Sequence, residues 1–240
     1  MVRAVGSMVL VLGFMFVAVK WNRKNGIMSG FGCLCCTVSL FFHTLSHDQG
    51  HFVFLRHTYL ITALLFLGGM HVQFFPSNMY IKTGKSNHGN ISDVVAICCI
   101  ALTIQFIFFT SSVFGGVEIS GNGVILSGIV SKSASSSWSS SSETSIVASF
   151  LAKCCGSLLF VVSMMFSAVK WNRANGKLGG IGCFLAIANL FAFGDALNIN
   201  DVLEGKINSL HFVALALLVG GTHVFFFPSN KVPKRVDKTK

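Results

Sequence analysis

Long apolar runs alternate with short polar connections along this chain. Each run holds roughly 17 to 24 residues with almost no charge, and about 20 helical residues cross a hydrocarbon core about 30 Å thick. Lipid also requires each backbone amide to bond within its own segment, so runs of this length are helices and not barrel strands. The predicted fold is an all-α integral membrane protein with about seven transmembrane helices, at residues 4–19, 27–45, 58–75, 93–115, 146–169, 178–194 and 209–227.

The chain also contains an internal repeat. Residues 1–42 align without a gap on residues 151–192, and 18 of these 42 positions are identical. After a two-residue insertion, residues 68–78 and 220–230 share the pattern Gly-Gly-x-His-Val-x-Phe-Phe-Pro-Ser-Asn. Such self-similarity marks duplicated structural units. It predicts a first three-helix repeat at 1–80, an extra transmembrane helix plus Gly/Ser-rich linker at 81–145, a second three-helix repeat at 146–230 and a basic cytosolic tail at 231–240.

The repeat also bears on orientation and on the start of the chain. Two three-helix units joined through one extra span point the same way, so they are expected to pack about a pseudo-two-fold axis along the membrane normal. This plan is similar in architecture alone to that of sugar transporters of the SWEET type, whose proline-marked helix motifs we do not find here. The first apolar run has the features of a signal peptide, but its counterpart at 151–169 is internal, so we expect a retained first helix.

Composition and charge agree with a lipid environment. Hydrophobic residues make up 52% of the chain and charged residues 11%, against roughly a quarter charged in soluble domains. Of the 18 Lys and Arg residues, 13 fall on one side of the alternating topology. The positive-inside rule then places the N-terminus on the non-cytosolic side and the C-terminus in the cytosol. It explains the net charge of +10 without a nucleic-acid partner.

Two repeated turns and their neighbouring glycines are the clearest local motifs. The Lys-Trp-Asn-Arg-x-Asn-Gly sequences suit membrane-interface anchors, because an indole ring fits the headgroup boundary and basic side chains attract anionic lipid. The glycines that follow allow helices to approach closely. The predicted anchors are Lys20, Trp21, Arg23, Lys170, Trp171 and Arg173, and the predicted helix-packing residues are Gly26, Gly30, Gly32, Gly176, Gly180 and Gly182.

A few polar side chains lie inside the predicted spans. His71 and His223 occupy matching positions, and an ionisable group within a span is a functional candidate. With Asn189 and Gln105 they form the candidate substrate-binding or gating set. The alternative is a structural role, because both histidines lie about 7.5 Å inside the cytosolic boundary at the helical rise. There imidazole can reach headgroups, water or a backbone carbonyl.

Metal and cysteine chemistry receive little support. His43, His47 and His51 recur at every fourth position and are weak candidates for a non-cytosolic metal site, which competes with an interfacial loop. The eight cysteines lie in or beside apolar spans, where thiols behave as small hydrophobes. Lipidation near Cys33 is the remaining alternative. We expect no cofactor and no bound metal.

Two classes of function remain open. No nucleophile elbow, phosphate loop or paired carboxylates are present, so we expect no enzyme. Sparse polarity within the spans favours a structural, assembly or trafficking membrane protein that contacts the lipid bilayer and other membrane proteins or a second copy. The parallel repeat favours a passive carrier or channel for a small uncharged solute. The two differ in whether His71, His223, Asn189 and Gln105 face one interior cavity.

Overall fold

Seven helices make up most of the described part of the chain. A computed structural model describes residues 1–46, 52–76, 90–110, 117–120, 123–125, 142–192 and 206–228. The helices within these ranges are α1 (Val2–Ala18), α2 (Arg23–Ser46), α3 (Phe52–Phe74), α4 (Asn90–Phe108), α7 (Ser142–Ala168), α8 (Arg173–Phe191) and α10 (Ser209–Phe226). Each of the seven predicted apolar runs therefore overlaps one helix, which confirms the predicted helical fold.

Four of these helices are long and apolar enough to cross a membrane. They are α2, α4, α7 and α10, and α1 is a shorter apolar helix. Many large apolar side chains also point outward from the bundle, among them Phe42 at 63% exposed and Leu67 at 64%. Soluble monomers rarely expose apolar surface so extensively. The apolar helices therefore indicate an integral membrane protein.

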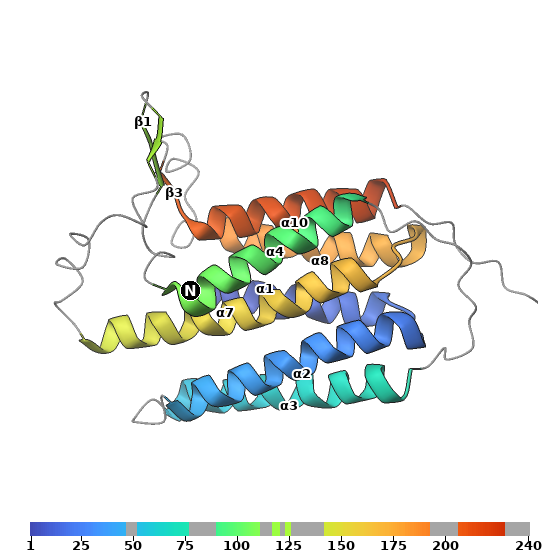
Figure 1. Cartoon of the computed structure of the whole chain (residues 1–240), viewed down its shortest axis with the longest axis horizontal. Helices are drawn as coiled ribbons and strands as arrows, with labels where there is room; N and C mark the ends of the chain where they lie inside the picture. Colours follow the sequence, from blue (N-terminus) through green and yellow to red (C-terminus); the bar gives the residue numbers. More distant parts are fainter. Residues whose placement is uncertain are drawn as a thin grey trace, which may run out of the picture.

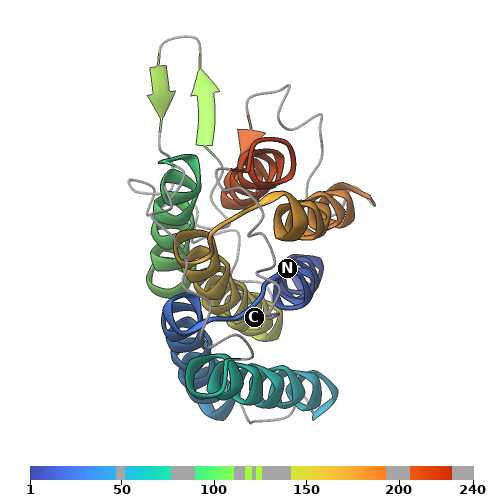
Figure 2. The same ribbon diagram turned by 90° about the vertical axis from the view of Figure 1, so that its right-hand side faces the viewer.

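The helices lie side by side in an order that differs from their order along the chain (Figure 1). Helix α2 packs against α3, and α8 packs against α10. Helix α1 packs mainly against α8, while α7 packs against α2, and α1 and α7 also touch each other. The first helix of each sequence repeat thus packs on the second helix of the other repeat. Helix α4 lies on α7 and α10 (Figure 2).

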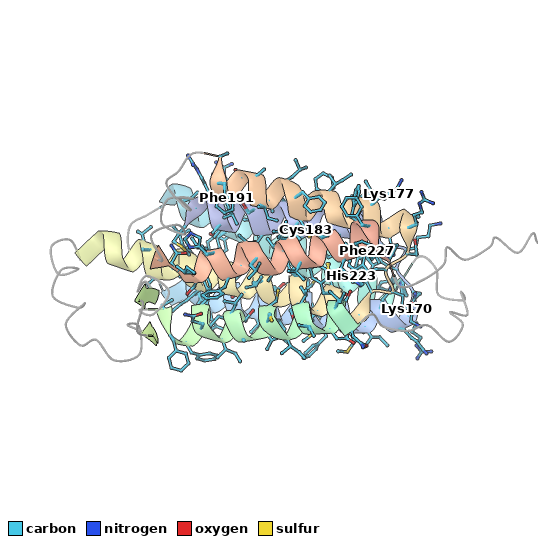
Figure 3. All side chains as sticks on the ribbon, turned by 90° about the horizontal axis from the view of Figure 1, so that it is seen from above. Lys170, Lys177, Cys183, Phe191, His223 and Phe227 are labelled. Atoms are coloured by element: carbon cyan, nitrogen blue, oxygen red, sulfur yellow. The ribbon has the colours of Figure 1, made fainter. Side chains whose placement is uncertain are left out.

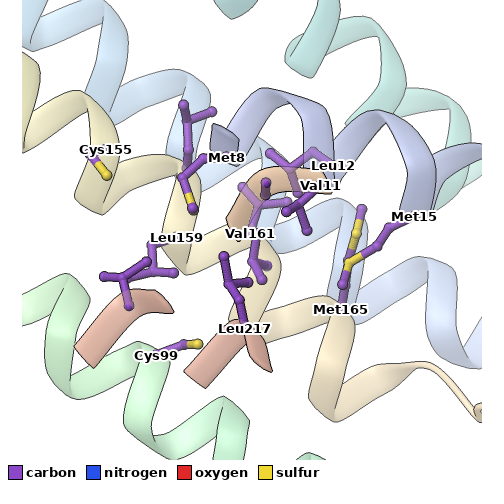
Figure 4. Close-up of a cluster of buried hydrophobic side chains, with 14 of the residues drawn as sticks. Met8, Val11, Leu12, Met15, Cys99, Cys155, Leu159, Val161, Met165 and Leu217 are labelled. Atoms are coloured by element: carbon purple, nitrogen blue, oxygen red, sulfur yellow. The ribbon is translucent and has the colours of Figure 1, made fainter. Parts of the chain in front are cut away.

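All seven helices contribute to the buried core, and one part of it lies between α1, α4, α7 and α10. Figure 4 shows its branched aliphatic and sulfur-containing side chains converging from these helices. Met8, Val11 and Met15 of α1 and Leu159 and Met165 of α7 are all fully buried. Methionine is flexible and fills irregular gaps between helices. This core joins the two halves of the sequence.

A small sheet lies beyond one end of the helices, which the all-α prediction did not include (Figure 1). Its strands are β1 (Val117–Ser120), β2 (Gly123–Ile125) and β3 (Lys206–Ile207), in the antiparallel order β2-β1-β3. Val117 pairs with Ile207, and Ser120 pairs with Gly123. The Gly121-Asn122 pair between β1 and β2 is a hairpin signal, and it lies within the predicted Gly/Ser-rich linker segment at 81–145.

Candidate functional site

The two Lys-Trp-Asn-Arg turns have the same hydrogen bonds. Asn172 caps α8, because its Oδ1 accepts from the backbone N–H groups of Ala174 at 2.9 Å and Asn175 at 3.2 Å. Asn175 returns a bond, since its Oδ1 accepts from Asn172 N at 2.7 Å and its Nδ2 donates to Lys170 O at 3.3 Å. Such reciprocal bonds satisfy the free amides at a helix start. The same four bonds, with lengths of 2.7, 3.0, 3.1 and 3.3 Å, recur in the first turn.

The tryptophans of these turns face inward. Trp21 is 6% exposed and Trp171 is 2% exposed. Each indole packs on a phenylalanine five residues earlier, with ring centroids 5.3 Å apart for Phe16 and Trp21 and 5.8 Å apart for Phe166 and Trp171. Trp21 Nε1 also donates to the carbonyl of Phe16. Both indole rings therefore pack into the end of the bundle beside the basic residues of the turns, and their role as membrane-interface anchors stays a prediction.

The basic residues of the turns do lie on the surface. Lys20, Arg23 and Arg173 are exposed, and Lys170 is partly exposed. Figure 3 shows Lys170 and Lys177 at one end of the bundle, the end at which Phe227 follows α10. Their position is compatible with the predicted contact to anionic headgroups.

The glycines that follow the turns lie at the closest helix contacts within each half. A Cβ added at Gly26 would overlap the carbonyl oxygen of Val72 on α3, and one added at Gly176 would overlap that of Val224 on α10. One turn later, a Cβ added at Gly30 would lie 2.9 Å from the carbonyl oxygen of Gly69 on α3. A Cβ added at Gly180 would lie 2.9 Å from the carbonyl oxygen of Gly221 on α10. Only glycine permits these backbones to approach so closely.

A third pair of glycines lies between the halves. A Cβ added at Gly32 on α2 would lie 2.9 Å from the Cβ of Met164 on α7. A Cβ added at Gly182 on α8 would lie 2.6 Å from the Cβ of Phe14 on α1. Gly32 aligns with Gly182, and Phe14 aligns with Met164. The same inter-half contact is therefore made twice, in opposite directions between the two repeats.

Hydrogen bonds between side chains also join the halves. Asn189 Nδ2 on α8 donates to Ser7 Oγ on α1 at 2.9 Å, and Ser7 Oγ donates to the carbonyl of Ala186 at 3.1 Å. At the aligned positions, Ser39 Oγ on α2 and Ser157 Oγ on α7 lie 2.8 Å apart. We call these two contacts the polar bridges. Sequence reasoning found Asn189 but missed the three serines, although the alignment of Ser7 with Ser157 within apolar runs was a usable signal.

The four candidate substrate-binding residues do not lie together. His223 is buried and its aligned partner His71 is exposed. Figure 3 places His223 near one end of the bundle and Phe191, two residues after Asn189, near the other. Gln105 lies ten residues after Val95 on α4, and Val95 contacts Gly220 on α10. Ten helical residues extend over about 15 Å, so Gln105 lies far along the bundle from His223.

Two pockets in the described part of the chain contain none of these four residues. One pocket of about 250 Å³ lies between α1, α3 and α7, and it is lined by Val9, Leu12, Gly13, Phe16, Ile61, Leu64, Leu65, Gly68 and Leu158. A second, of about 520 Å³ and more open, runs along α1 beside Leu178. Both walls are apolar, so neither pocket offers hydrogen bonds to a polar solute.

The predicted metal candidates are only partly described. His43 lies near the end of α2, whereas His47 and His51 lie outside the described residues. Within the described ranges no three His, Cys, Asp or Glu side chains come together as a metal-binding group. The predicted histidine cluster therefore stays a prediction.

The fold and these contacts define a class: a bundle of apolar helices held together by close glycine contacts and a few polar bridges, as in integral membrane proteins. Comparisons with protein-family models, with curated proteins and with solved structures found no match. The function is therefore argued from the residues themselves.

Proposed function

We propose that this chain is a multi-pass integral membrane protein of structural, assembly or trafficking type that carries out no chemical reaction. The observation that carries the proposal is the use of the intramembrane polar groups. Ser7, Ser39, Ser157 and Asn189 bond one helix to another. In lipid such bonds help helices to associate.

The proposal includes seven crossings in two parallel halves. The matched contacts of Gly32 and Gly182, the two polar bridges and the two identical turns support a pseudo-two-fold relation along the membrane normal. Helices α1, α3 and α8 lie beside the four candidate spans (Figure 1). Because Lys170 and Lys177 lie at one end of the bundle (Figure 3), the proposal makes that end the cytosolic one and the N-terminus non-cytosolic.

A passive carrier for a small uncharged solute is the second candidate. It is supported by the doubled, parallel plan, which is typical of carriers that move two halves about a central path. It is less supported than the first candidate, because the four polar candidates are divided between the bundle ends and the two pockets are apolar. Neither candidate needs a cofactor, a metal or a nucleic acid.

Reconstitution separates the two. The purified chain in liposomes should transmit urea, glycerol and neutral sugars no faster than empty liposomes, as measured by osmotic light scattering. The same protein in a mild-detergent extract of its membrane should migrate on a native gel as a larger assembly than the purified chain. A matched pair of variants, Ser7→Ala and Asn189→Ala, should each lower stability by about 1 kcal/mol, because each change removes two hydrogen bonds between α1 and α8.

The opposite result would establish the carrier. In that case solute flux exceeds that of empty liposomes, and His71→Ala combined with His223→Ala abolishes it while membrane abundance stays unchanged. An equal loss of abundance in that double variant would mark the histidines as structural.

A further inference from the structure

The two halves of the bundle differ in one helix. Helix α4 lies in the groove between α7 and α10, the first and third helices of the second repeat. The first and third helices of the first repeat are α1 and α3, and among the described residues no helix lies in the groove between them (Figure 2). We call these the α4 groove and the open groove.

Small residues line the α4 groove where α4 touches it. A Cβ added at Gly156 on α7 would lie 2.7 Å from the Cβ of Phe106, and one added at Gly220 on α10 would lie 3.0 Å from Cγ1 of Val95. Two hydrogen bonds hold α4 in place as well. They join Ser163 Oγ to Ala96 O at 3.1 Å and Thr103 Oγ1 to Gly156 O at 3.3 Å.

The aligned positions of the open groove are also small residues, and no described residue covers them. Gly6 aligns with Gly156 and Gly13 with Ser163. A Cβ added at Gly6 or Gly13 meets no atom within 4 Å. Both glycines are exposed, whereas Gly156 and Ser163 are buried.

The neighbouring side chains show the same contrast. Val9 is 36% exposed and its counterpart Leu159 is 0% exposed. Leu64 is 61% exposed and its counterpart Ala216 is 8% exposed. These open-groove residues line the apolar pocket of about 250 Å³ described above. In the second half α4 covers the counterpart side chains. In the first half no described helix covers the aligned side chains, and they stay exposed.

We propose that the open groove binds one transmembrane helix of a partner protein, a helix with the chemistry of α4. This inference rests on the proposed membrane function. The chemistry of the occupant follows from the residues that α4 places in its own groove. The partner helix is apolar, has a small residue at the place of Ala96 and has a hydroxyl seven residues later, at the place of Thr103. That hydroxyl would donate to the Gly6 carbonyl as Thr103 donates to Gly156.

The geometry also sets the direction of the partner helix. Ala96 of α4 is hydrogen-bonded to Ser163 of α7, and Thr103 of α4 is hydrogen-bonded to Gly156 of α7. Residue numbers therefore rise along α4 as they fall along α7, so the two helices are antiparallel. The partner helix therefore runs antiparallel to α1. Gly13 lacks the hydroxyl of Ser163, so one of the two bonds has no counterpart and the partner is held less tightly than α4. A second copy's α4 is excluded as the occupant because it fills its own groove.

The test uses α4 itself as the probe. The full chain carries the photo-crosslinking residue p-benzoylphenylalanine in place of Leu64, in liposomes with a tagged single-span peptide of residues 90–108. Leu67 on the same helix, 64% exposed and outside the pocket lining, is the matched control position. Crosslinking to the peptide from position 64 should exceed that from position 67 at least fivefold, and a scrambled peptide should show no such excess.

A filled groove should remove this excess. Gly13→Leu places a side chain where nothing lies within 4 Å, so the chain should keep its melting temperature while crosslinking from position 64 falls to the control level. Val9→Trp is the second variant should the first misfold. The proposal is overturned if positions 64 and 67 crosslink equally, if both variants leave the yield unchanged, or if position 64 forms only lipid adducts or dimers of the chain. Release of the chain from membranes by alkaline carbonate would instead contradict the proposed function.

Discussion

At the scale of single residues, the turns show how far sequence reasoning reaches. The Lys-Trp-Asn-Arg sequences do lie beside a reversal between two helices, but the Asn-Gly pairs lie in the first turn of α2 and α8, where Asn25 and Asn175 form the capping bonds. The inward direction of Trp21 and Trp171 could not be predicted, because an indole beside lysine suits either a headgroup or a helix end. Which of the two holds depends on the phenylalanine that packs on each ring.

Asn172→Ala tests the turn bonds. The change removes the cap that accepts from Ala174 N and Asn175 N, and losing a helix cap costs about 1 kcal/mol. The melting temperature in detergent should fall by about 2 to 4 °C. Arg173→Ala, an exposed neighbour in the same turn, serves as the control and should leave it unchanged. Equal effects of the two variants would contradict the role of the cap.

At the scale of helices, apolar length predicted the elements but not their partners. The predicted span at 93–115 corresponds to α4 at Asn90–Phe108. The short sheet was not predicted, because its strands are only two to four residues long. A helix that is apolar on all sides presents no preferred face in its sequence. The packing of α1 on α8 therefore could not be derived from hydrophobic pattern, whereas the glycines that mediate it could be identified.

Two glycine variants test whether close glycine contacts between helices stabilise the fold. Gly176→Ala places a methyl group on the carbonyl oxygen of Val224, and such overpacking costs about 1 to 3 kcal/mol. Its melting temperature should fall by roughly 2 to 12 °C. The methyl group added by Gly13→Ala meets no atom within 4 Å. Alanine also stabilises a helix by about 1 kcal/mol relative to glycine, so this variant should not lower the melting temperature. A thermal melt in which both variants behave alike would show that the close contact does not stabilise the fold.

At the scale of the whole molecule, the duplication gave the plan of two similar halves. It could not reveal that α4 breaks their equivalence, because a repeat comparison says nothing about a segment that occurs once. Nor could it show that first helices are exchanged between halves. Spatial exchange leaves the order of the chain, and so the alignment, unchanged.

Glycan mapping in microsomes tests the orientation. Asn90-Ile91-Ser92 is a natural acceptor sequence at the start of α4, on the proposed cytosolic side. A second acceptor engineered into the serine-rich segment at 133–142 lies on the proposed luminal side, and a third in the basic tail serves as a cytosolic control. Only the second should gain a glycan, seen as a shift on a gel. Modification at Asn90 would reverse the orientation or change the number of crossings.

The exchange of first helices has a consequence for biosynthesis. Helix α1 leaves the ribosome long before α8, against which it packs and which is complete only at Phe191. At 5 to 20 residues per second, the intervening stretch takes on the order of 10 s or more to translate. Throughout that interval α1 and its uncovered glycines must be held by the insertion machinery or by lipid, so the first half of this chain finishes its assembly only when the second half is nearly made.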